Sequence, residues 1–238
     1  MEKPTKKIII INGSGGVGKD AFAKRVIEET LIEETIKMIN CYTTDCYTTE
    51  QIKNGQIYNY VADPEIYYRS NNISTIDCVK TIARMFDWNG EKSEKDRKML
   101  SDFKDLLTNY NDYPFKRIVT QITDWLRYDK SKPNDMYDHS FLFVHCREPK
   151  EIERLKNQFP NDTFTLLVQN PKVAKVTGNH ADREVENYNY DFTVVNDSDL
   201  RALRKVAIDF YKKIFIQGVV KYKFVASDYD FSPEERDS

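Results

Sequence analysis

Eight consecutive residues near the N-terminus have the composition and spacing of a phosphate-binding loop. The run Gly13-Ser14-Gly15-Gly16-Val17-Gly18-Lys19-Asp20 matches the pattern GxxxxGK, with an aspartate where serine or threonine usually follows the lysine. Glycines let the backbone curl so that successive N–H groups point at an anion, and the N-terminal end of a following helix adds positive potential. We therefore expect residues 13–20 to cradle the phosphates of ATP, with Lys19 reaching the β and γ phosphates.

Asp20 is the unusual member of this loop. In the common form of the motif the hydroxyl group after the lysine ligates Mg²⁺. A carboxylate can do the same or hold the ion through a water molecule. Asp20 is therefore the expected magnesium residue, and ATP and Mg²⁺ are the expected cofactors. A glycine-rich turn that binds nothing is the alternative, and the sequence on either side of the loop argues against it.

The residues that flank the loop predict the elements that position it. Ile8–Ile11 form a run of β-branched residues, which is typical of a strand buried on both faces of a parallel sheet. From Lys19 onward, apolar residues such as Phe22, Val26 and Leu31 recur at helical spacing. The predicted order of strand, glycine loop and helix is the context in which the motif binds phosphate.

Similar patterns along the rest of the chain predict an α/β protein. Apolar runs predict further strands at Ile36–Cys41, Ser140–Cys146, Thr163–Val168 and Asp191–Val195. Helical spacing predicts helices from Ile76 to near Asn89-Gly90, and at Glu94–Tyr110, Pro114–Tyr128, Lys150–Phe159 and Asp199–Ile216. Strands separated by helices imply a three-layer α/β/α fold with a mostly parallel sheet. We expect one domain over residues 1–226, with residues 227–238 as an acidic, flexible tail.

Two later segments, together with the GKD form of the loop, carry a family resemblance. The first is His145-Cys146-Arg147-Glu148-Pro149, and the second runs from Asn179-His180-Ala181-Asp182-Arg183-Glu184 to Asp197. They resemble the nucleoside-monophosphate-kinase-like branch of P-loop proteins, in particular the deoxynucleoside monophosphate kinases of bacteriophages and the phosphomevalonate kinases. The resemblance implies a P-loop NTPase fold, Arg147 at the phosphate-facing end of the third strand, and Asn196 near the adenine.

The same resemblance implies an activity and exposes one departure from the family. The implied activity is transfer of the γ-phosphate of ATP to a nucleoside or deoxynucleoside monophosphate. Many relatives end the third strand with a carboxylate for magnesium, whereas this chain has His145-Cys146 there. Two other functions therefore stay open: a kinase of another phosphorylated metabolite, and a regulatory module that binds nucleotide without catalysis.

Cationic residues outside the loop are the candidates for contacts with the acceptor and the donor. Arg147 can clamp a phosphate bidentately, which lysine cannot do. Residues 42–138 are the expected helical or irregular insertion that binds the acceptor, and residues 170–190 are the expected lid. The candidate residues in those two segments are Arg97, Lys172, Lys175, Asp182 and Arg183. A solvated surface, or a helix cap for the last two, is the alternative for each.

Composition excludes several classes of function. The net charge of −2 provides no positive field for a nucleic-acid backbone, and no apolar run approaches the length of a membrane span. The four cysteines and three histidines have no metal-binding spacing, so we expect reduced thiols and no catalytic histidine. The sequence favours a cytoplasmic protein whose partners are ATP and a small phosphorylated acceptor, with neither nucleic acid nor membrane. A homodimer is compatible with it.

Overall fold

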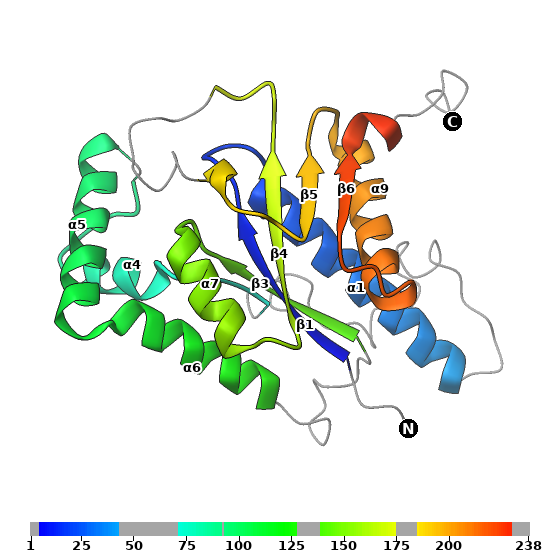
Figure 1. The fold of residues 1–238 in the computed structure, drawn as a ribbon, viewed down its shortest axis with the longest axis horizontal. Coiled ribbons are helices and arrows are strands. Elements are labelled where there is room, and N and C mark those ends of the chain that lie inside the picture. The colour runs from blue at the N-terminus through cyan, green and yellow to red at the C-terminus, as the bar shows by residue number, and fades with distance from the viewer. Residues whose placement is uncertain (1–4, 43–70, 92, 128–138, 175–184, 230–238) are drawn as a thin grey trace.

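A parallel β-sheet of six strands organises the part of the chain described by the computed structural model, which covers residues 5–42, 71–91, 93–127, 139–174 and 185–229 (Figure 1). The strands are β1 (Thr5–Asn12), β2 (Asn72–Ser74), β3 (His139–His145), β4 (Thr163–Gln169), β5 (Phe192–Val195) and β6 (Tyr222–Val225). Their order across the sheet is β2-β3-β1-β4-β5-β6, and every neighbouring pair is parallel. The predicted α/β architecture with a parallel sheet is confirmed.

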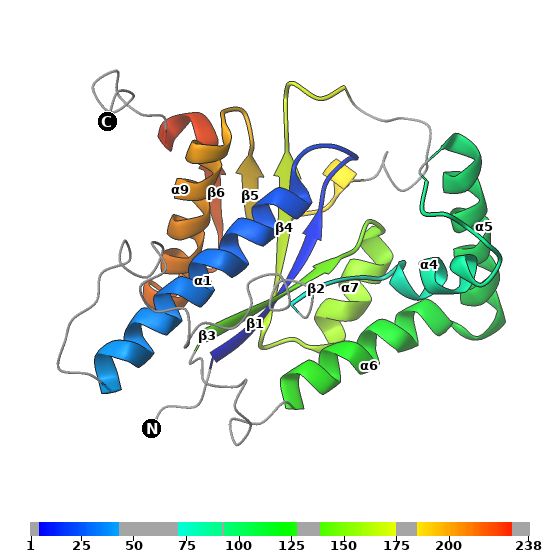
Figure 2. The same ribbon diagram turned by 180° about the vertical axis from the view of Figure 1, so that it is seen from behind.

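Helices cover both faces of this sheet. The described α-helices are α1 (Lys19–Tyr42), α4 (Asp77–Arg84), α5 (Glu94–Asn111), α6 (Tyr113–Arg127), α7 (Pro149–Gln158) and α9 (Leu200–Tyr211). Helices α1 and α9 lie together on one face, while α6 and α7 cover the other (Figure 2). Two 3-10 turns, η2 (Val185–Asn187) and η4 (Ala226–Tyr229), and a π-helical turn, η3 (Lys212–Ile216), complete the described elements.

Strand β1 contains four consecutive isoleucines because it contributes to the core on both faces. Ile9 and Ile11 point into the core beneath α1 and α9, and Ile8 and Ile10 point into the core beneath α6 and α7. All four side chains are fully buried. Successive side chains of a strand alternate between faces, so a continuous isoleucine run fits the central position of β1 between β3 and β4.

Helices α4 and α5 form a separate small unit at one end of the sheet. Val79, Ala83 and Leu100 are its buried core, and this cluster is distinct from the two main cores. Helix α5 begins with a capping box in which Ser93 and Asp96 exchange hydrogen bonds, and it ends at Asp112, which has a left-handed φ of 59°. The predicted helices Glu94–Tyr110 and Pro114–Tyr128 are confirmed to within a residue.

Two predictions of secondary structure are wrong, and two short strands were missed. Residues Ile36–Cys41 continue α1 to Tyr42 instead of forming a strand. Both edges of β1 are already occupied by β3 and β4, and no glycine or proline interrupts the helix before residue 42. Helix α4 ends at Arg84 rather than near Asn89-Gly90, because the chain turns with a positive φ at Asp87. The short strands β2 and β6 were not predicted.

The expected flexible tail begins with an ordered turn. Ser227 donates hydrogen bonds from its backbone nitrogen and its hydroxyl to the Asp197 carboxylate, each over 2.8 Å. The Tyr229 hydroxyl donates to Asp209 over 2.6 Å. Residues 227–229 are therefore part of η4, and the other tail residues lie outside the described part of the chain. None of the described helices is both long and apolar enough to cross a membrane.

Candidate phosphate-binding site

The glycine loop lies at the centre of the carboxyl edge of the sheet. It follows β1, which is flanked by β3 and β4, and it leads directly into α1. The chain continues from β1 into α1 on one face of the sheet, and from β3 into α7 on the opposite face. The carboxyl ends of β1 and β3 thus form a topological switch point, and open α/β sheets typically bind their ligands at such a point.

Two positions of the loop require glycine for structural reasons. Gly13 has a φ of 144°, and a Cβ atom on it would lie 2.3 Å from the Val168 carbonyl oxygen of β4. Gly18 has a φ of 99°, and a Cβ atom there would lie 2.6 Å from the side-chain nitrogen of Asn196. Gly15 has open space around it. The loop is therefore clamped against β4 and the end of β5, while its tip leaves room for a ligand.

Lys19 directs its charge back onto the loop. Its ammonium group donates hydrogen bonds to the carbonyl oxygens of Gly13 and Ser14, the latter over 2.7 Å. The Lys19 ammonium group therefore lies beside the backbone of the glycine loop, just before the first turn of α1. An anion held by the loop would meet both this charge and the positive end of the helix.

Asn12, which the sequence analysis did not single out, anchors the start of the loop. It is fully buried, and its Oδ1 accepts a hydrogen bond from the Gly13 nitrogen over 2.8 Å. Its Nδ2 donates to the Tyr190 hydroxyl over 2.8 Å and to the Arg147 carbonyl over 3.0 Å. One amide thus fixes the loop to the end of β3 and to the segment before β5. An asparagine that ends a buried strand was the available signal in the sequence.

Asn196 braces the opposite side of the loop. Its Nδ2 donates to the Val17 carbonyl over 3.1 Å, and its backbone nitrogen donates to Gln169 of β4 over 2.7 Å. The structure therefore gives Asn196 a bracing contact, and its proximity to an adenine stays a prediction.

Asp20 meets His145, which ends β3. The distance from His145 Nε2 to Asp20 Oδ1 is 3.5 Å, and Nε2 lies 2.9 Å from Asn72 Oδ1 of β2. The Asp20 side chain is 82% exposed, whereas that of His145 is 15% exposed. The spacing of the histidines along the chain gave no sign that one of them would face the loop.

His145 is neutral at physiological pH. Burial lowers its pKa to about 4; the nearby Asp20 and Asp77 carboxylates oppose this shift, and the Lys19 and Lys80 ammonium groups reinforce it. The hydrogen-bond partner of Nε2 is Asn72 Oδ1, and a proton on Nε2 would be donated to that oxygen.

The donor set around Asp20 fits magnesium held jointly with phosphates. Among the described residues, no group of three or more His, Cys, Asp or Glu side chains could hold a metal ion without other ligands. Magnesium bound to nucleotide phosphates typically needs only one or two protein carboxylates, because it keeps several waters. The exposed Asp20 carboxylate, next to Lys19 at the loop, meets that requirement.

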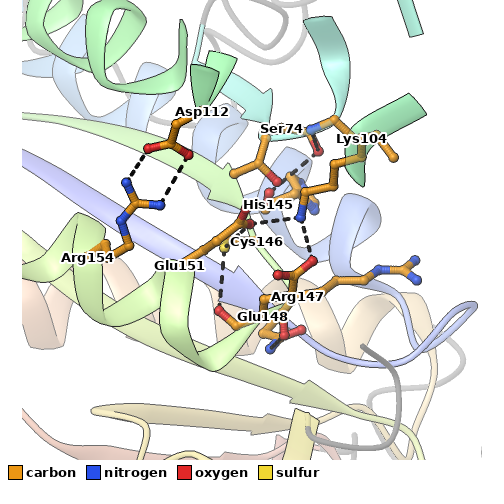
Figure 3. Close-up of polar contacts among 12 residues, drawn as sticks. Ser74, Lys104, Asp112, His145, Cys146, Arg147, Glu148, Glu151 and Arg154 are labelled. Carbon is orange, nitrogen blue, oxygen red and sulfur yellow. Dashed lines mark hydrogen bonds and ion pairs between the residues drawn. The ribbon is translucent and has the colours of Figure 1, made fainter. Parts of the chain in front are cut away.

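Arg147 is exposed just past β3, beside an ionic network that joins α5 to α7 (Figure 3). Lys104 of α5 donates to Glu148 over 2.6 Å and to Glu151 over 3.0 Å. Burial lowers the pKa of Lys104, but the two carboxylates outweigh it, so the net shift is upward. The Cys146 thiol packs against Glu151, and burial raises its pKa well above the usual value, which fits an unreactive, reduced thiol.

A second contact between α5 and α7 lies farther from the loop. Arg154 donates to both carboxylate oxygens of Asp112, and its guanidinium stacks 3.6 Å from the centre of the Phe115 ring. The two ionic contacts fix the α4–α5 unit relative to the end of β3 and to Arg147 (Figure 3). None of these ion pairs was found from the sequence, since the partners are separated by more than 40 residues.

A pocket of about 310 Å³ opens beside the loop. Its lining is mainly apolar and consists of Ser14, Val17, Leu167, Val168, Gln169, Asn170, Pro171, Val173, Val185, Glu186 and Val195. This volume is at the lower end of the range for small-molecule sites. The pocket therefore provides a small, mainly apolar site directly beside the glycine loop.

The structure describes two of the remaining predicted residues, Arg97 and Lys172. Arg97 is exposed on α5, and Lys172 is exposed in the turn that follows β4. Lys175, Asp182 and Arg183 lie outside the described residues, so their predicted roles are untested. A scan against models of protein families found no match for the chain, and a search of curated proteins found no significant match.

Proposed function

We propose that this protein is a P-loop phosphotransferase that moves the γ-phosphate of ATP to a nucleoside or deoxynucleoside monophosphate. The observation that carries the proposal is the glycine loop between β1 and α1, with Lys19 at its end and glycine-only geometry at Gly13 and Gly18. A loop of this kind at a switch point binds the phosphates of a nucleotide. Membership of the nucleoside-monophosphate-kinase-like family is part of the same proposal.

Each residue of the site has a defined part in this function. The loop amides and Lys19 hold the β and γ phosphates, and the Asp20 carboxylate would hold Mg²⁺ directly or through water. An ion bound there would neutralise charge on the donor phosphates. Arg147 binds the transferred or the acceptor phosphate, since a guanidinium fits two phosphate oxygens at once.

Transfer then needs only alignment and charge neutralisation. An oxygen of the acceptor phosphate forms a bond to the γ-phosphorus, and the bond from that phosphorus to the β–γ bridging oxygen breaks, which releases ADP. Phosphoryl transfer has a loose transition state, so positioning and electrostatics supply most of the rate. A cytoplasmic location, where ATP is available, is consistent with this activity.

The end of β3 favours a second candidate function. His145 stands where many relatives of the proposed family carry a magnesium-binding carboxylate, so nucleotide could bind without transfer and act as a regulatory signal. Within the kinase class, another phosphorylated metabolite such as phosphomevalonate is the alternative acceptor.

The test is an assay of ADP release with ATP, Mg²⁺ and each common ribo- and deoxyribonucleoside monophosphate. Lys19→Ala should abolish turnover, whereas Lys24→Ala, which removes an exposed lysine farther along α1, should retain it. Absence of turnover with every nucleotide acceptor would contradict the proposed substrate class. Tight ATP binding without transfer to any acceptor, phosphorylated metabolites included, would support the regulatory function instead.

A further inference from the structure

The pocket beside the glycine loop has walls that come from two distant parts of the chain. Ser14 and Val17 belong to the loop, whereas Val185 and Glu186 belong to η2. A ligand with phosphates on the loop and another group in the pocket would contact both walls. Its affinity would then depend on how firmly the two walls are held relative to each other.

A chain of buried hydrogen bonds joins these two walls. The Gly13 nitrogen donates to Asn12 Oδ1 over 2.8 Å, and Asn12 Nδ2 donates to the Tyr190 hydroxyl over 2.8 Å. The Tyr190 hydroxyl donates in turn to the Val185 carbonyl over 2.7 Å. Asn12 is fully buried, and Tyr190 and Val185 are 7% and 2% exposed. The residue that receives the last hydrogen bond therefore also lines the pocket.

The chemistry of these groups fixes the direction of each hydrogen bond. A backbone N–H group only donates and a carbonyl only accepts, so the Asn12 amide must present its oxygen to Gly13. Its NH₂ group then donates to the Tyr190 hydroxyl and, over 3.0 Å, to the Arg147 carbonyl. Because the NH₂ group cannot accept, the one proton of the Tyr190 hydroxyl goes to Val185. The chain of hydrogen bonds thus has a single arrangement, and it passes through one hydroxyl group.

We propose that Tyr190 is a positioning residue that couples the glycine loop to the η2 wall of the pocket. The coupling holds the phosphates on the loop and the nucleoside in the pocket as parts of one ligand. The inference rests on the proposed function, which places a nucleotide at this loop. The Tyr190 ring packs against that of Tyr188, with centroids 4.9 Å apart, and a phenylalanine would pack in the same way. The hydroxyl is therefore the group that carries the coupling.

The first experiment compares two ligands of the full chain, ATP and inorganic tripolyphosphate, each measured by calorimetry with Mg²⁺. Tyr190→Phe should weaken ATP binding by about 10-fold, within the range typical of coupling between sites. Tripolyphosphate affinity should change by less than about twofold, because Asn12 still accepts the hydrogen bond from Gly13. Equal weakening of both ligands would mean that Tyr190 only supports the loop, and would overturn the inference. Unchanged affinity for both ligands would overturn it as well.

Tyr211→Phe is the matched control, because it removes the hydroxyl of another buried tyrosine. That hydroxyl donates to Glu34 over 2.9 Å in the core beneath α1 and α9, and Tyr211 does not line the pocket. The variant should lose stability with its hydrogen bond, but it should keep the wild-type ratio of ATP affinity to tripolyphosphate affinity. A similar fall of that ratio in both variants would mean that lost stability is the cause, and the coupling role would be wrong.

A second measurement can overturn the inference without any variant. The ¹⁵N signal of the Glu186 amide reports on the preceding Val185 carbonyl, which accepts the hydrogen bond from Tyr190. Tripolyphosphate bound to the wild-type loop should shift this signal, and the shift should largely disappear in Tyr190→Phe. No shift in the wild type, or an equal shift in both proteins, would contradict the coupling without bearing on kinase activity. If the wild type binds neither ATP nor tripolyphosphate, the proposed function fails and the coupling role fails with it.

Discussion

Gly13 lies so close to the backbone of Val168 that a Cβ atom on it would be 2.3 Å from the Val168 carbonyl oxygen. This contact joins the first residue of the glycine loop to β4, the strand beside β1. The nearest atom on the other side of this contact belongs to the backbone of Val168. A clash with a Cβ atom at residue 13 could therefore not be relieved by the movement of a flexible side chain. The position of the loop therefore depends on the absence of a side chain at residue 13.

Gly13→Ala should destabilise the protein by about 2 to 4 kcal/mol, from strain at a positive φ and from the clash with β4. Gly15→Ala is the matched control, because a Cβ atom there would meet nothing within 4 Å. Its free energy of unfolding should change by less than about 0.5 kcal/mol. Urea unfolding of both variants measures the difference, and equal stabilities would contradict the described loop.

The elements around the loop were predictable because their signals are local and long. The isoleucine run, the glycine spacing and the helical pattern from Lys19 each depend on adjacent residues. Strand β2 has only the three residues Asn72–Ser74, and β6 has four with one side chain buried, so neither has an apolar run to detect. The wrong strand at Ile36–Cys41 came from a short apolar segment whose spacing fits a helix equally well.

The partners within the site could not be predicted, because they depend on tertiary contacts. Asn72 and His145 are 73 residues apart, and Lys104 is 44 residues from Glu148. Nothing in the local pattern distinguishes Lys104 from the other charged residues of α5. The loop was thus identified from sequence, whereas the residues that hold and orient it required the structure.

Lys104 should contribute more to stability than any exposed ion pair on the same helix. Lys104→Met would leave Glu151, which is 7% exposed, without its cation. Breaking a buried ion pair in this way costs about 3 to 5 kcal/mol of stability. We expect Lys104→Met to lose about 2 to 3 kcal/mol, because the other partner of Lys104, Glu148, is 43% exposed. Removing the second charge in Lys104→Met with Glu151→Gln should recover part of the loss.

The control for this prediction is Lys98→Met on the same helix. Lys98 pairs with Asp102, and their side chains are 75% and 60% exposed, so its loss should cost under about 1 kcal/mol. Thermal and urea unfolding of the three variants give the comparison. Similar losses for Lys98→Met and Lys104→Met would show that the contacts between α5 and α7 do not stabilise the fold.

His145 should make stability depend on pH below neutrality. Its pKa is lowered from 6.5 to about 4 by burial, so the unfolded chain binds a proton there before the folded chain does. The stabilisation is complete above pH 6.5 and is lost as the pH falls toward 4. Between neutral pH and about pH 5, protonation of His145 in the unfolded chain should lower the free energy of unfolding by about 2 kcal/mol.

His145→Gln provides the comparison for the pH effect, because glutamine does not titrate. The difference in unfolding free energy between wild type and His145→Gln should change by about 2 kcal/mol from neutral pH to about pH 5. Carboxylates that also titrate in this range affect both proteins and cancel in the difference. A difference independent of pH would mean that His145 binds protons equally in the folded and unfolded states.

The Arg147 side chain should matter for phosphoryl transfer. The backbone carbonyl of Arg147 accepts the hydrogen bond from Asn12, and this contact is retained whatever the side chain is. Arg147→Ala and Arg147→Lys should therefore leave the loop anchored through Asn12. In the kinase assay, both variants should lower kcat by about 100-fold, because a lysine cannot reproduce bidentate contact with a transferring phosphate.

Lys150→Ala is the control for this prediction, because it removes another exposed cation close in sequence and should leave kcat unchanged. If Arg147→Lys retained full activity, the guanidinium would not be the group that binds the phosphate, and charge alone near the end of β3 would suffice.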